Sequence, residues 1–305
     1  MKWLKIKLYN MDKILITGGT STVGKHLKEI LPDAIYVSSK ICDLTDIKNV
    51  RKLISSNTPD IVIHLAAKVG GIQDNIAKPA EYFDDNILMN TNILKVSHEY
   101  KVKRFIGILS TCIYPDKVNS YPMKEEVMFD GPPTSTNFSY GYAKRALAVQ
   151  IDAYNKQYST KYNYLTPCNL YSEHDNFNNE SKMHFMTALL KKIKSSKETL
   201  NLLGTGKPLR QFMYAGDLAR IIKKVIDNNI TNSFNVATLE NLSIDEMANI
   251  SLNILNKNLK IKYSKPELDG QFRKDVSIDK MKKIIPNFEF TKFKEGVKKV
   301  YDKIS

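Results

Sequence analysis

Short apolar runs alternate with amphipathic segments through the first half of the chain. The runs have the length of buried strands, and the segments between them repeat apolar residues at helical spacing. This alternation is typical of a parallel sheet with right-handed crossovers, so the predicted class is α/β, a Rossmann-type doubly wound parallel sheet. We predict strands over 14–17, 35–37, 60–65, 104–109 and 162–166, and helices over 23–31, 79–100 and 140–158, with another helix opening at 43–46.

The alternation loosens beyond Tyr171, which indicates a smaller C-terminal α/β lobe. A loop rich in Asn, Asp and Glu follows, then a helix near 185–194. We therefore divide the chain into a nucleotide-binding unit, residues 11–170, and a mainly substrate-binding lobe, residues 171–305. A return segment near 212–237 is expected to rejoin the first unit, and the first ten residues are expected to be an extension of no evident role.

Composition narrows the class of partner. The formal charge is +14, but the basic residues are dispersed without a long tail, so we expect attraction of an anionic substrate and no nucleic-acid binding. No run approaches the ~20 apolar residues of a membrane span, and lysines interrupt the apolar residues at the amino terminus too often for a signal-peptide core. The three cysteines form no metal-type array. We expect a cytoplasmic protein with free thiols and no metal site.

A glycine-containing turn joins the first predicted strand to the first helix. Backbone N–H groups at such a turn, together with the helix dipole, favour a bound phosphate. Gly18 stands where the tight turn needs glycine and Gly24 where the helix must approach the sheet, whereas Ser21 replaces the middle glycine. The cofactor-binding candidates here are Gly18, Thr20, Ser21, Thr22, Val23 and Gly24.

The end of the second strand bears on which cofactor is bound. An acidic residue there would bind a ribose 2′-hydroxyl and favour NAD, whereas this chain has Ser38-Ser39-Lys40, which suits a 2′-phosphate. We therefore predict NADP(H), with Ser39 and Lys40 at that phosphate. Asp43 and Leu44 are placed to contact adenine, and Asp43 is also suited to cap a helix.

Tyr140 and Lys144 lie one turn apart on the predicted helix 140–158 and therefore share a face. A nearby ammonium lowers the pKa of a phenol, and a tyrosine tuned in this way exchanges a proton with a carbonyl oxygen during hydride transfer. Ser110 directly follows a core strand, at the sheet edge that faces the ligand crevice. Together these residues predict carbonyl reduction.

Four further motifs carry a resemblance to a known family. They are Ser110-Thr111-Cys112-Ile113-Tyr114-Pro115, the stretch Leu65 to Ile72, Asn169-Leu170-Tyr171 with His174-Asp175-Asn176-Phe177, and Asp269-Gly270-Gln271-Phe272. Together they resemble the GDP-L-fucose synthase family, the GDP-4-keto-6-deoxymannose 3,5-epimerase/4-reductases of the extended short-chain dehydrogenase/reductase type. The resemblance extends from about Asp12 over nearly the whole chain. The chain departs from the family at Ser172-Glu173, where Gly-Pro is usual, and at Ser21-Thr22.

The resemblance implies NADPH-dependent 3,5-epimerisation and 4-reduction of GDP-4-keto-6-deoxy-D-mannose to GDP-L-fucose. Reduction in the family uses a serine, a tyrosine and a lysine, matching Ser110, Tyr140 and Lys144. Epimerisation uses a cysteine and a histidine as acid/base groups, matching Cys112 and His184. A ketone at C4 acidifies the protons on C3 and C5, so one carbonyl serves every step.

The resemblance also implies binding residues and an assembly. Cofactor contacts are expected at Leu65, Ala66 and Ala67, and a homodimer is expected through the helices 79–100 and 140–158. Expected substrate contacts are Val69, Asn169, Lys192, Arg210 and Arg273, with Lys274 as an alternative source of positive charge.

Other functions stay open. A UDP-4-keto-6-deoxyhexose epimerase/reductase, making UDP-L-rhamnose or a related amino sugar, would use the same catalytic set. A 4,6-dehydratase is disfavoured, because such enzymes carry an acidic pair where this chain has Cys112-Ile113. The third alternative is a non-catalytic NADP-binding regulator, and the retention of all five candidate catalytic residues argues against it.

Overall fold

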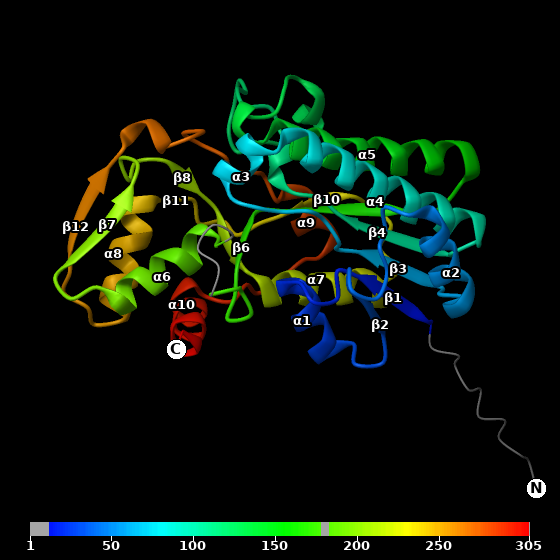
Figure 1. Cartoon of the computed structure of the whole chain (residues 1–305), viewed down its shortest axis with the longest axis horizontal. Coiled ribbons are helices and arrows are strands. Elements are labelled where there is room, and N and C mark those ends of the chain that lie inside the picture. The colour runs from blue at the N-terminus through cyan, green and yellow to red at the C-terminus, as the bar shows by residue number, and fades with distance from the viewer. Residues whose placement is uncertain (1–11, 178–182, 305) are drawn as a thin grey trace, which may run out of the picture.

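A six-stranded parallel sheet forms the centre of the computed structural model, which describes residues 12–177 and 183–304 (Figure 1). Its strand order is β10-β5-β4-β3-β1-β2. The strands are β1 (Ile14–Thr17), β2 (Ile35–Val37), β3 (Ile61–His64), β4 (Arg104–Ile108), β5 (Asn163–Pro167) and β10 (Phe234–Val236). The predicted α/β class and parallel sheet are confirmed. The chain leaves β1 toward β2 on one side and resumes with β3 on the other, which creates a crevice at the carboxyl ends of β1 and β3.

Helices cover both faces of this sheet. On one face α1 (Thr22–Ile30) packs against α7 (Ala215–Asp227). On the other, α4 (Pro79–Glu99) packs against α2 (Ile47–Asn57) and α5 (Phe138–Tyr158), with α4 and α5 side by side (Figure 1). The apolar residues at helical spacing therefore meet the apolar strands from both sides, as a doubly wound sheet requires.

The helix predicted to open at 43–46 is α2, but its capping residue differs from the one considered in the sequence. Asp46, not Asp43, caps this helix, because its carboxylate accepts the Lys48 backbone N–H at 2.8 Å. Asp43 instead accepts both the backbone N–H and the hydroxyl of Thr45, at 2.9 and 2.7 Å. The prediction that Asp43 caps a helix is therefore wrong, since a local turn already uses its carboxylate.

The smaller lobe is built from short paired strands and three helices. The strands β6 and β9 pair in parallel, as do β7 and β12, and β8 and β11 are antiparallel. Its elements are β6 (Asn169–Tyr171), α6 (Phe185–Ser195), β7 (Thr199–Leu203), β8 (Leu209–Arg210), β9 (Phe212–Tyr214), β11 (Leu242–Ser243), α8 (Ile244–Ile254), β12 (Lys260–Ser264) and α10 (Phe293–Lys303). Two short helices, α3 (Ile72–Ala77) and α9 (Asp279–Ile284), complete the described chain with 3₁₀ turns.

Two hydrophobic cores result, and β9 contributes to both. Met213 belongs to the core around the sheet, whereas Phe212 and Tyr214 belong to the core of the smaller lobe. The return segment near 212–237 contains α7 and β10, and β10 pairs with β5. Later residues, including Val276 and Met281, also pack in the sheet core. Among the helices of residues 12–177 and 183–304, none has the length and apolar character needed to cross a bilayer.

Candidate functional site

The turn after β1 brings three segments of backbone into close contact. Gly18 has φ +71°, and a Cβ there would lie 2.8 Å from the Ala66 nitrogen. A Cβ on Gly24 would lie 2.7 Å from the carbonyl oxygens of Gly18 and Gly19. Ser21 caps α1 by accepting the Gly24 backbone N–H at 3.1 Å. Both glycines are therefore sterically required, and the serine in place of a middle glycine satisfies a helix terminus.

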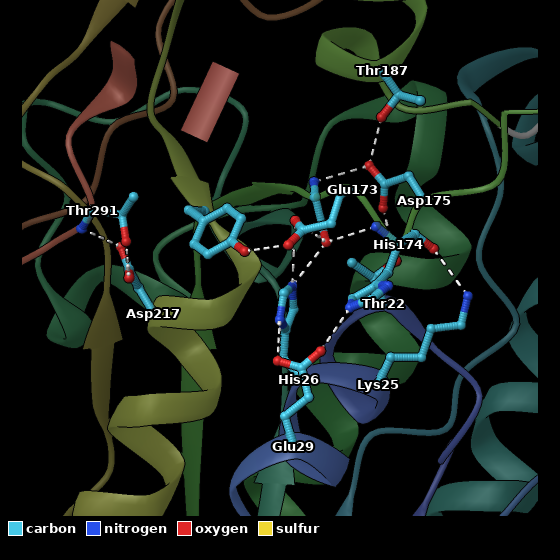
Figure 2. A network of polar contacts seen from close by, with 12 residues as sticks. Thr22, Lys25, His26, Glu29, Glu173, His174, Asp175, Thr187, Asp217 and Thr291 are labelled. Atoms are coloured by element: carbon cyan, nitrogen blue, oxygen red, sulfur yellow. Dashed lines mark hydrogen bonds and ion pairs between the residues drawn. The ribbon is translucent and has the colours of Figure 1, made fainter. Parts of the chain in front are cut away.

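A pocket of about 530 Å³ lies over this turn. Thr20, Ser21, Thr22 and Lys25 line one side, and the loop His174–Phe177 lines the other. The Thr22 hydroxyl donates to Asp175 at 2.8 Å, which joins the two sides (Figure 2). Val23 is buried beneath the turn. Backbone N–H groups and hydroxyls therefore face a space suited to a diphosphate.

The candidates beyond β2 and β3 border the same crevice. Ser39 and Lys40 are exposed just after β2, with no acidic residue at that strand end. Leu65, Ala66 and Ala67 follow β3, where Ala66 lies against Gly18. Val69 is 50% exposed and Asp43 is exposed, whereas the Leu44 side chain is buried in the sheet core. A 2′-phosphate thus fits the free hydroxyl and ammonium after β2.

Tyr140 and Ser110 meet where α5 crosses the end of β4. Burial raises the pKa of Tyr140, the neighbouring Cys112 raises it further, and a hydrogen bond with Ser110 acts in the opposite direction. Lys144 is 1% exposed, donates to the Ile108 carbonyl at 2.9 Å, and has a pKa lowered by burial to about 8. The expected lowering of the phenol pKa by Lys144 is therefore wrong, because Lys144 is not among the groups that shift this pKa and burial raises it. A protonated phenol suits a proton donor.

Cys112 is partly buried in the 3₁₀ turn after Ser110 and accepts two polar hydrogens. Asn137 Nδ2 and Lys274 Nζ lie 3.0 and 3.1 Å from its sulfur. Burial is the largest single effect and raises the pKa of the thiol, but the Lys274 ammonium and the hydrogen bonds from Ser110, Lys274 and Asn137 together outweigh it. The net pKa lies below the ordinary thiol value. Such a thiol is a stronger candidate for proton transfer than a buried apolar cysteine.

The sequence did not reveal the contacts of Asn137 and Lys274 with the Cys112 sulfur. Lys274 was expected only as a possible partner of substrate phosphate, and Asn137 was missed. Asn137 stands three residues before Tyr140, and this spacing near the helix start is the one local signal that could have pointed to it. Lys274 comes from 162 positions away, so only the fold reveals its contact.

The other substrate candidates occupy different environments. Arg210 donates to the carbonyls of Leu209 at 2.8 Å and Phe272 at 3.4 Å, and burial lowers its pKa while Asp269 and Cys112 act to raise it. Arg210 therefore lies within electrostatic reach of the Cys112 thiol. Arg273 is bound to Asp275 through two nitrogens, at 2.6 and 2.9 Å.

Three more candidates lie along the smaller lobe. Asn169 donates to the Gln211 carbonyl at 3.0 Å, and Lys192 donates to the Asn201 carbonyl at 3.1 Å. His184 is exposed at the start of α6, where it is the N-cap residue. Within residues 12–177 and 183–304, no hydrogen bond joins His184 to Ser110, Cys112 or Tyr140. Contacts within the described residues thus join the serine, the cysteine and the tyrosine, while His184 stands at the N-terminus of α6.

Comparison with known proteins covers both the sheet and the smaller lobe. Residues 14–237 match the family model described as the NAD dependent epimerase/dehydratase family. A probable GDP-L-fucose synthase of Drosophila melanogaster is 32% identical over 94% of this chain and 95% of that protein. A GDP-L-fucose synthase of Dictyostelium discoideum is 33% identical over 93% of this chain and 92% of that protein. A solved GDP-L-fucose synthetase from Naegleria fowleri, bound to NADP, superposes with a TM-score of 0.86 at 32% identity, covering 98% of this chain and 94% of that one.

Replacing Lys274 by methionine is expected to move the ionisation of Cys112 to higher pH, because the ammonium that favours the thiolate is removed. The measurement is the rate of alkylation by iodoacetamide as a function of pH, with the modified cysteine identified by mass spectrometry. Cys42 and Cys168 are buried and should react slowly. The control is Lys262→Met on β12, an exposed lysine; an unchanged profile for Lys274→Met would refute the role of Lys274.

Proposed function

This chain belongs to the NAD dependent epimerase/dehydratase family, and we propose that it converts GDP-4-keto-6-deoxy-D-mannose to GDP-L-fucose by 3,5-epimerisation and NADPH-dependent 4-reduction. The match over residues 14–237 places it in the family. The relatives at 32% and 33% identity are named a probable GDP-L-fucose synthase and a GDP-L-fucose synthase, which favours a GDP-sugar over a UDP-sugar. We also propose a cytoplasmic location, supported by three cysteines that remain free thiols.

The observation that carries the proposal is the meeting of a phenol, a hydroxyl and an acidified thiol at the end of β4. Ser110 contacts both Tyr140 and Cys112, and the Lys274 ammonium lowers the pKa of the thiol against the effect of burial. Reduction alone would need the hydroxyl and the phenol. An acidified thiol beside them adds a group that can remove a carbon-bound proton.

We propose NADP(H) as the cofactor because the residues around the glycine turn fit it. A cradle free of Cβ atoms at Gly18 and Gly24 leaves backbone N–H groups open to a diphosphate, and Ser39 with Lys40 suits a 2′-phosphate. The bound cofactor supplies the hydride for C4. The similar Naegleria fowleri structure is bound to NADP, which supports the same assignment.

In the proposed reduction, Tyr140 donates its phenolic proton to the C4 oxygen as hydride reaches the carbon. Burial keeps this phenol protonated at neutral pH, so the proton is available. Ser110 orients the same oxygen by hydrogen bonding. Lys144 holds α5 against β4 through the Ile108 carbonyl, and its pKa of about 8 keeps it mainly protonated at neutral pH.

In the proposed epimerisations, the Cys112 thiolate removes the proton from C3 or C5, and the electron pair enters an enolate whose oxygen faces Ser110 and Tyr140. His184 then delivers a proton to the opposite face of the carbon, so that one C–H bond breaks and another forms. The thiol and the imidazole return to their starting states through solvent. The hydrogen bonds from Lys274 and Asn137 to the sulfur support the thiolate.

For the nucleotide sugar, we propose Arg210 as the main contact of the diphosphate, with Val69, Asn169, Lys192 and Arg273 around the substrate. The support for Arg210 is its electrostatic reach to Cys112, the proposed base of the epimerisations. Arg273 would contribute charge while remaining paired with Asp275.

The substrate is tested by incubating the full chain with NADPH and either GDP- or UDP-4-keto-6-deoxyhexose. Loss of NADPH absorbance and identification of the sugar product report both reduction and stereochemistry. We expect consumption of the GDP-sugar with formation of GDP-L-fucose. Preferential use of the UDP-sugar would contradict the proposed substrate, and no turnover of either would favour the non-catalytic regulator.

Substitutions at Tyr140 and Cys112 are expected to impair reduction and epimerisation separately. Tyr140→Phe should lower reduction about 10²–10⁴-fold, because the proton donor is lost. Cys112→Ser should instead lower deuterium exchange at C3 and C5 in D₂O, measured by mass spectrometry without NADPH. Tyr142→Phe and Cys42→Ser are the matched controls and should behave like the wild type. Equal turnover of Tyr140→Phe and the wild type, or unchanged exchange in Cys112→Ser, would remove the corresponding role.

We also propose a homodimer formed through α4 and α5. The two helices lie side by side on the outer face of the sheet (Figure 1). Both expose large apolar side chains. Phe83 and Leu88 on α4 are 39% and 45% exposed, and Tyr142 and Val149 on α5 are 40% and 50% exposed. A second copy of the same pair of helices would cover these side chains in a symmetric interface.

The combined variant Leu88→Glu/Val149→Glu is expected to sediment as a monomer where the wild type sediments as a dimer, because two charges from each copy would be buried at the interface. Sedimentation velocity measures the mass. Leu239→Glu, at a residue that is 71% exposed outside these helices, is the control. A wild-type monomer, or a dimer that survives the double substitution, would rule out this interface.

A further inference from the structure

A cluster of two imidazoles and a carboxylate lies behind the phosphate turn, outside the proposed catalytic residues. His26 comes from α1, and Glu173 and His174 come from the loop after β6 (Figure 2). One ligand atom from each of the three lies within 4.8 Å of the other two. His26 is 4% exposed, and Glu173 and His174 are partly buried. Three residues from two separate elements thus converge on a shielded point.

Glu29 orients both rings from the outer side. Its carboxylate oxygens lie 3.8 Å from Nδ1 of His26 and 3.2 Å from Nε2 of His174. The ring nitrogens that Glu29 does not contact are Nε2 of His26, which is hydrogen-bonded to the Ser172 hydroxyl, and Nδ1 of His174. A carboxylate on the far nitrogen of a histidine is the usual support of a metal-bound imidazole, since it fixes the tautomer and raises ligand basicity.

Glu173 presents one oxygen toward the same point. The Tyr214 hydroxyl donates to its Oε1 at 2.6 Å, while Oε2 lies 3.9 Å from Nε2 of His26. The Ser172 hydroxyl lies among the three groups, 2.8 Å from Nε2 of His26 and 3.2 Å from Oε2 of Glu173. Metal–ligand bonds are about 2.0–2.2 Å long, so small side-chain rotations would displace this hydroxyl and close the site around an ion.

A positively charged side chain lies near the cluster. The Lys299 ammonium stands 4.8 Å from the centre of the Tyr214 ring and opposes any nearby cation. The cluster would therefore select a metal ion by the type of its ligand atoms rather than by net negative charge.

We propose that His26, Glu173 and His174 bind a divalent transition-metal ion, with Zn²⁺ favoured by the two nitrogens and one carboxylate oxygen. The site depends on the departure of this chain from its family, because Glu173 replaces the second residue of the usual Gly-Pro. It takes no part in the proposed reaction.

A bound ion would fasten the phosphate turn to the smaller lobe. His26 lies on the helix that Ser21 caps, and the loop carrying Glu173 also carries Asp175. Asp175 accepts hydrogen bonds from Thr22 at 2.8 Å and Thr187 at 2.5 Å, so it already joins the turn to α6. Since the ion would bind the folded chain only, it should raise the midpoint of thermal unfolding.

The test uses the full chain, stripped with a chelator and titrated with Zn²⁺ or Mg²⁺ alone. We expect one Zn²⁺ per chain by calorimetry and a higher unfolding temperature with Zn²⁺ but not with Mg²⁺. His174→Asn and Glu173→Gln should each weaken Zn²⁺ binding by more than about 100-fold. Glu29→Gln, at an exposed residue whose replacement leaves the fold intact, should weaken it about 10–100-fold.

His98→Asn on α4 is the matched histidine control and should bind Zn²⁺ like the wild type. Co²⁺ is the spectroscopic probe, because a thiolate-to-cobalt band would locate the ion at Cys112 and overturn the proposal. Unchanged affinity in His174→Asn, Glu173→Gln and Glu29→Gln would overturn it as well. Neither readout requires turnover, so failure here is distinguishable from failure of the proposed enzymatic function.

Discussion

A buried hydrogen bond from Lys144 Nζ to the Ile108 carbonyl fastens α5 to the end of β4. Tyr140 precedes Lys144 by one helical turn, and Ser110 follows Ile108 by two residues. The contact therefore sets the separation of the phenol and the hydroxyl. Because a regular helix and a central strand carry both groups, their geometry is held by the most densely packed part of the molecule.

Contacts between residues far apart in the sequence bring positive charge to Cys112. The Lys274 ammonium reaches the Cys112 sulfur from the far end of the chain, and Arg210 adds positive charge from β8. Two opposing effects meet at the sulfur: burial disfavours the thiolate and the neighbouring cation favours it. At Cys112 the Lys274 ammonium and the hydrogen bonds from Ser110, Lys274 and Asn137 together outweigh burial, whereas at Tyr140 burial outweighs the hydrogen bond with Ser110.

The strands and long helices could be predicted because their signal is local. Apolar runs and helical spacing marked β1 to β5 within about a residue of their ends, and the glycine turn followed from steric needs at Gly18 and Gly24. The capping role of Asp43 was wrong because Asp43 and Asp46 are equivalent in sequence, and only the turn made with Thr45 distinguishes them. Contacts of Lys274 could not be predicted, since they exist only once the lobes have folded together.

The strand β9 has a mechanical consequence. Met213 points into the core of the sheet, while Phe212 and Tyr214 point into the core of the smaller lobe, and neighbouring β6 divides Leu170 and Tyr171 in the same way. If β6 and β9 left one core, their side chains would also be lost from the other core. Because the two cores share these strands, neither lobe should unfold independently of the other. We expect the protein to unfold in one cooperative transition.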